Sequence, residues 1–93
     1  MNVTVEVSFS FKADLVDHPV TLALAEEEDV NTALRALVAK YPQVSSRIFT
    51  DGGDVHPYIN VLKNGGNVRF QRGFKTALHD RDHLTIVPPV GGG

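Results

Sequence analysis

The chain has 93 residues, which is enough for one domain but not for two hydrophobic cores. Hydrophobic residues make up 42% and charged residues 22% of the sequence, a balance that is typical of globular domains and argues against disorder. The net charge of −2 gives no general attraction for DNA or RNA. The sequence contains no cysteine, which excludes disulfides, thiolate metal sites and cysteine nucleophiles. Because no apolar run reaches membrane-spanning length and the N-terminus does not resemble a signal peptide, we expect a cytoplasmic protein.

The first half of the chain predicts two strands followed by a helix. Apolar and polar residues alternate over residues 3–11, as in a strand with one buried face. A second strand over residues 20–24 follows a short connection, which favours an antiparallel hairpin. Apolar residues then recur at helical spacing over residues 30–41. We expect Asp29 to cap this helix and Pro42 to end it.

The second half predicts mainly strands. A short helical turn over residues 44–49 precedes a strand over residues 58–62. The Asn-Gly pair within residues 63–67 predicts a hairpin turn, with residues 68–70 returning as a short strand. Residues 84–87 form the last predicted strand. Three apolar side chains of the irregular stretch from 73 to 83 are expected to reach the core: Phe74, Ala77 and Leu78.

This order of elements predicts an α+β fold with one main helix across one face of a mixed sheet of four to five strands. The helix and the sheet would bury their apolar faces against each other. The first and last strands would lie next to each other in the centre of the sheet and run parallel.

The C-terminal segment is the most unusual feature of the sequence. Pro88 and Pro89 favour an extended path away from the last strand, and Val90 leads into the glycines 91–93. A backbone without Cβ atoms can enter a slot that is too narrow for side chains. The pattern alone leaves two interpretations open. The segment is either a stalk that presents the carboxylate of Gly93 to other proteins or a flexible tail without a function, such as a remnant of expression.

The whole chain resembles the ubiquitin-like sulfur carriers and the small archaeal modifier proteins. This group includes the small subunit of molybdopterin synthase and the thiamine sulfur carrier. The most specific resemblance is the run Leu-Thr-Ile-Val-Pro-Pro-Val at 84–90 followed by glycines; residues 46–49, 60–65 and 73–78 are also similar. The resemblance implies a β-grasp domain over residues 1–90 and a flexible glycine tail over 91–93. Three terminal glycines depart from the usual ending, in which a residue other than glycine precedes Gly-Gly.

The resemblance also implies a carrier cycle. An activating enzyme related to the ubiquitin-activating enzymes would use ATP to adenylate Gly93, while Gly91 and Gly92 occupy that enzyme's active site. The product would become a thiocarboxylate, which donates sulfur to an enzyme such as the large subunit of molybdopterin synthase, or an isopeptide bond to lysines of target proteins. The domain itself would hold no catalytic residue, metal or bound cofactor. Which pathway receives the sulfur stays open.

Partner docking is expected beside the tail, at Val87, Pro88, Pro89 and Val90. If Ile86 faces the helix, alternation places Val87 on the opposite face, where it could form an apolar patch; packing of Val87 under a loop is the alternative. A different class of function, a binding module that uses only its sheet face, also remains. The spacing of His79 and His83 would suit zinc on a helix, but a solvated turn is the favoured interpretation.

Overall fold

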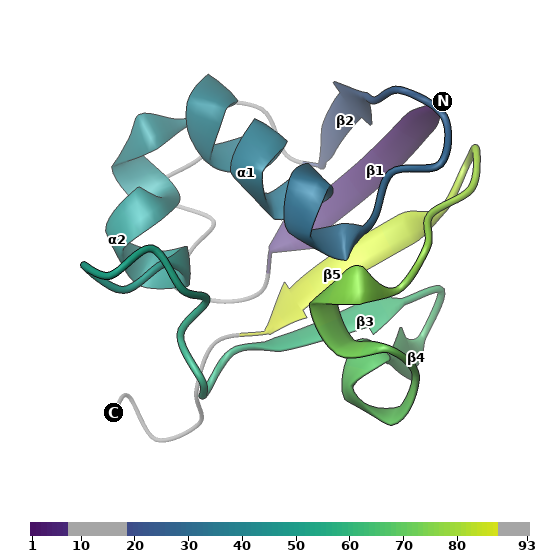
Figure 1. Ribbon diagram of the computed structural model, residues 1–93. Helices are drawn as coiled ribbons and strands as arrows, with labels where there is room; N and C mark the ends of the chain where they lie inside the picture. Colours follow the sequence, from purple (N-terminus) through teal and green to yellow (C-terminus); the bar gives the residue numbers. More distant parts are fainter. Residues whose placement is uncertain (8–18, 88–93) are drawn as a thin grey trace.

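The chain forms one mixed sheet with helices on one face (Figure 1). The computed structural model describes residues 1–7 and 19–87. The five strands are β1 (Asn2–Val7), β2 (Val20–Ala23), β3 (Asn60–Lys63), β4 (Gly66–Asn67) and β5 (His83–Val87). Their order is β2-β1-β5-β3-β4, with β1 and β5 parallel and the other neighbours antiparallel. The predicted fold class and the parallel central pair are therefore confirmed.

The main helix, α1 (Val30–Lys40), crosses one face of the sheet (Figure 1). The side chain of Asp29 accepts a hydrogen bond from the Thr32 N–H at 2.9 Å, so the predicted cap is confirmed. Pro42 ends α1 and begins a 3₁₀ turn, η2 (Pro42–Val44), which continues into the short helix α2 (Ser45–Ile48). Two further 3₁₀ turns follow β4: η3 (Val68–Phe70) and η4 (Gly73–Lys75).

The core lies between α1 and the sheet. Burial alternates along β1 and β5, as the predicted period of two requires. The helix contributes the apolar residues of its inner face to the same core. The fully buried side chains with the largest volumes are Leu34, Leu37, Ile48, Leu84, Ile86, Val3, Val5, Val7, Val20, Val30, Val44 and Val61.

The β3–β4 hairpin turns at Asn64 and Gly65, as the Asn-Gly pair predicts. Their φ angles are +50° and +89°, and two consecutive positive values are typical of the type I′ turn. The predicted return strand over residues 68–70 is wrong, because β4 ends at Asn67. The Asn67 side chain accepts a hydrogen bond from the Arg69 N–H at 2.9 Å, and this contact turns the chain into η3.

Two predictions differ from the structure in detail, and two others cannot be compared with it. The third strand begins at Asn60 and not at residue 58. Ala77 is exposed, so its predicted place in the core is wrong, whereas Leu78 is buried and Phe74 packs partly against the core. The continuation of the first strand to residue 11 and the predicted domain boundary at residue 90 lie outside the described residues. Within residues 1–7 and 19–87, no helix is long and apolar enough to cross a membrane.

Candidate functional site

The tail predicted to carry the function follows a central strand of the sheet. Strand β5 pairs with β1 on one side, Val5 facing Leu84, and with β3 on the other, Val61 facing Ile86. Leu84 and Ile86 are fully buried against the helix side. A strand that is hydrogen-bonded on both edges and buried on one face does not unfold locally; it unfolds only together with much of the domain. Strand β5 therefore provides a stable attachment point for a C-terminal segment that other proteins are expected to bind.

A hydrogen-bond cluster fixes the start of β5 to the β3–β4 turn. The carboxylate of Asp82 accepts hydrogen bonds from the His79 N–H at 2.7 Å and from the Asn64 side-chain amide at 2.9 Å. The side-chain oxygen of Asn64 in turn accepts from the His83 N–H at 2.9 Å. Asp82 is only 7% exposed, and a carboxylate at such a position needs these donors. The cluster thus sets where β5 begins relative to β3.

Among the described residues, no helix or strand covers the face of the sheet opposite α1. This face carries two partly exposed apolar residues near the end of β5. Ile86 is buried and Val87 is partly exposed, which is the alternation expected of these two neighbours. Val87 lies opposite Asn60, and Leu62 lies opposite Thr85. Leu62 and Val87 are therefore diagonal neighbours on one face, a separation that larger side chains can bridge. Together these two residues form what we call the open-face pair.

Most of the predicted site lies beyond the described residues. Pro88, Pro89, Val90 and the glycines 91–93 fall in the C-terminal segment that the structure does not describe. Val87 is the predicted docking residue whose position is known. Sequence reasoning missed Leu62, although the alternation with Val61 could have placed it on the face of Val87. It also missed Asp82, because the link of its carboxylate to the β3–β4 turn depends on Asn64, which is 18 residues away.

The two histidines considered as zinc ligands have separate neighbours. His79 is exposed on a turn, with its Nδ1 at 3.9 Å from Asp82, whereas His83 Nε2 lies 3.4 Å from Glu6 on the open face. No group of three or more His, Asp or Glu side chains that could hold a metal ion occurs in residues 1–7 and 19–87.

Solved structures with the same arrangement define the class of protein. The crystal structure of SAMP1 from Haloferax volcanii superposes with a TM-score of 0.89 over 100% of both chains at 29% identity. The solution structure of small archaeal modifier protein 1 from Methanosarcina acetivorans gives a TM-score of 0.89 at 32% identity, over 99% of this chain and 96% of that one. The fold is the ubiquitin-like β-grasp of the carrier and modifier proteins.

The sequence comparisons give the family. The ThiS family matches residues 11–93, and the chain belongs to this family. It is 43% identical over 68 residues to small archaeal modifier protein 3 of Haloferax volcanii, covering 73% of each chain. It is 34% identical over 71 residues to the sulfur carrier protein CysO of Mycobacterium tuberculosis, covering 74% of this chain and 76% of that one. The resemblance noted in the sequence is thus confirmed, since these relatives are a modifier protein and a sulfur carrier protein.

Proposed function

We propose that this protein is a ubiquitin-like carrier whose reactive group is the carboxylate of Gly93. Its carboxylate oxygen attacks the α-phosphate of ATP in an activating enzyme and releases pyrophosphate, which gives a mixed anhydride with AMP. Two reactions can follow. A lysine amine of a target protein displaces AMP and forms an isopeptide bond, or a partner's persulfide displaces AMP and a thiol then reduces the acyl disulfide to a thiocarboxylate.

The observation that carries the proposal is a glycine tail that follows, after three intervening residues, a central strand paired on both edges. Ordering each residue of such a tail costs about 1–2 kcal/mol, which the partner's channel must offset. The fold and the family relationship support the same function, since the relatives include both sulfur carriers and modifiers. In this proposal ATP is bound by the partner, catalysis belongs to the partner, and the reactions take place in the cytoplasm.

The experiment that tests the proposal is incubation with ATP, the cognate activating enzyme and a sulfur source. Intact-mass analysis should show an adenylate and then one oxygen replaced by sulfur at the C-terminus. A chain shortened by Gly92 and Gly93 is the control and should stay uncharged. If the intact chain also stays uncharged while a partner still binds it, the non-covalent binding module becomes the better interpretation.

We further propose that the open-face pair is where the activating enzyme docks, together with Pro88, Pro89 and Val90. The partly exposed side chains of Leu62 and Val87 lie at the end of β5, from which the tail continues, so a partner that covers them would also receive the tail. A crystal structure of a BexX/CysO complex from Amycolatopsis orientalis, 25% identical with a TM-score of 0.77 over 98% of this chain and 99% of that one, shows that a similar protein forms a complex.

The docking proposal predicts a position-dependent effect on the same face. Val87→Glu should lower the rate of adenylation more than tenfold, since burying an unpaired carboxylate at an interface costs more than about 1.4 kcal/mol. Thr21→Glu on β2 is the matched control because Thr21 is exposed and lies at the far edge of the sheet; its rate should change less than about twofold. Equal rates for the two variants would contradict docking at the open-face pair.

A further inference from the structure

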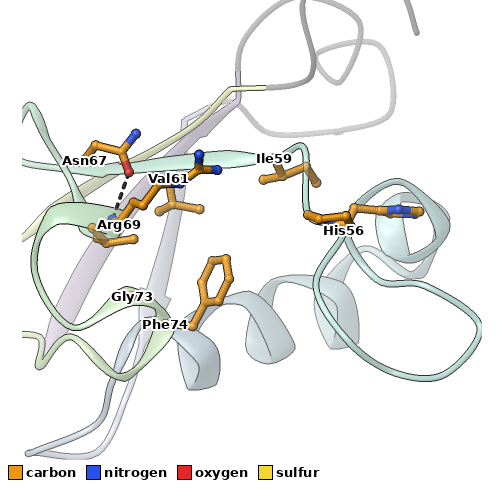
Figure 2. Close-up of a pocket in the computed structure, with 9 residues that line it drawn as sticks. His56, Ile59, Val61, Asn67, Arg69, Gly73 and Phe74 are labelled. Carbon is orange, nitrogen blue, oxygen red and sulfur yellow. Dashed lines mark hydrogen bonds between the residues drawn. The ribbon is translucent and has the colours of Figure 1, made fainter.

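A surface distinct from the open-face pair lies on the helix side of the sheet, beside β3. Here a hollow of about 170 Å³ opens between β3, the loop before it, and the 3₁₀ turns η3 and η4. Figure 2 shows the ring of Phe74 pointing from η4 toward Val61 on β3. The lining is mainly apolar: Pro57, Ile59, Val61, Val68 and Phe74. A cavity of about 150 Å³ with an apolar lining can take up a benzene ring, so this hollow has room for one bulky apolar side chain.

The polar rim of the hollow is cationic. Arg69 reaches across it toward β3, with Asn67 beside it and His56 at the far end (Figure 2). In the part of the chain that the structure describes, no carboxylate lies within ion-pair distance of the Arg69 guanidinium. The sequence from 55 to 79 contains four Lys or Arg residues and no Asp or Glu. An anionic ligand group at this rim would therefore meet no carboxylate from the segment that builds it.

A neighbouring hollow extends the positive charge. The stretch that joins η3 to η4 also lines a second hollow, whose lining includes Lys63, Arg72 and Lys75. Carboxylates on either side of an apolar anchor would therefore be attracted to the rim and to this flanking surface.

The exposed aromatic residues adjoin the same hollow in sequence. Phe70 is 85% and Tyr58 is 70% exposed, and these are the exposed large hydrophobic residues among those that the structure describes. Tyr58 stands between two lining residues, Pro57 and Ile59, and Phe70 directly follows Arg69. Aromatic residues and arginine are the types that are enriched in protein-binding surfaces.

We propose that this apolar hollow binds a segment of a partner protein that carries one bulky apolar side chain flanked by carboxylates. The apolar side chain enters between Val61 and Phe74, and its acidic neighbours lie against Arg69 and the flanking lysines and arginines. The site lies on the helix side of the sheet, whereas the open-face pair lies on the other side. A partner bound there therefore leaves the open-face pair free, and the site does not rest on the chemistry proposed for Gly93.

An NMR titration of the full chain with the synthetic peptide acetyl-Asp-Glu-Leu-Asp-Asp-amide tests the proposal. At low salt the peptide should shift the amide signals of Ile59, Val61, Val68 and Phe74 in a saturable way, because surface charges are least screened there. A peptide with Ala for Leu should bind about tenfold more weakly. A peptide with Lys for every acidic residue should not bind.

Two variants of equal charge change make the test specific. Arg69→Glu should weaken binding of the acidic peptide about fivefold or more, whereas Lys40→Glu, on the exposed end of α1, should leave the affinity within about twofold. A chain without Gly92 and Gly93 should bind as the intact chain does, so failure of the tail chemistry and failure of this site are distinguishable. The proposal is overturned if peptide concentrations on the order of 10 mM produce no saturation, if the shifts fall on the open-face pair, or if both charge variants bind equally.

Discussion

Replacing Asp82 should reveal how much the cluster at the start of β5 contributes to stability. Asp82→Ala removes the acceptor for the His79 N–H at 2.7 Å and for the Asn64 amide at 2.9 Å. A buried donor left without a partner costs about 1–3 kcal/mol. The Asp82 side chain is 10% exposed, and the hydrogen bonds that it accepts from His79 and Asn64 are both partly buried, so water can replace the carboxylate only in part. The free energy of unfolding should therefore fall by about 2–3 kcal/mol.

Thermal and urea unfolding measure this loss. For a domain of this size each kcal/mol lowers Tm by about 4–8 °C, so a decrease of about 10–20 °C is expected. Asp51→Ala is the control, since Asp51 is exposed; its unfolding free energy should change by less than about 0.5 kcal/mol. A double-mutant cycle with Asn64→Gly, which suits the positive φ at this position, should give a coupling of about 1 kcal/mol. A loss no larger than that of the control would refute the reasoning.

Three further predictions concern stability and are measured by urea denaturation. Gly65→Ala should cost about 1–2 kcal/mol because Gly65 has φ +89°, whereas Gly52→Ala, which meets only ordinary van der Waals contact at 3.8 Å, should cost less than about 1 kcal/mol; equal losses would contradict the strain argument. Asp29→Ala should cost about 1 kcal/mol through the lost helix cap, and no loss would show that the cap adds nothing. Leu34→Ala at a fully buried position should cost about 2–5 kcal/mol, and a loss below 1 kcal/mol would place Leu34 outside the tightly packed core.

The central elements could be predicted from the sequence because their signals are local and repeated. The alternation of apolar residues over the first strand and their helical spacing after Asp29 each predict an element with one apolar face. Packing the helix on the sheet buries both faces. The turn at Asn64 was predictable because its positive φ suits few residue types.

The wrong predictions concern residues whose positions depend on contacts that the periodicity of the sequence does not reveal. Val68 is buried, as a strand residue would be, but a side-chain contact from Asn67 to the Arg69 N–H turns the backbone after only two residues of β4. The exposure of Ala77 beside the buried Leu78 depends on where the chain meets the start of α1, since Leu78 N–H donates to the Glu28 carbonyl at 2.9 Å. The apolar hollow was also not predictable, because its walls come from β3, η3 and η4.

The position of β5 links the fold to the proposed carrier role. A partner that draws the tail into a channel pulls on the last residues of this strand. On an edge strand such a pull would break one ladder of hydrogen bonds, whereas β5 is held by β1 and β3 together and by the Asp82 cluster at its start. In the proposed cycle, the base of the tail would therefore stay fixed while Gly93 passes from one partner to the next. A fixed base would also keep Val87 and Leu62 in constant register, so that the proposed docking surface would be the same for each enzyme that acts on the carboxylate.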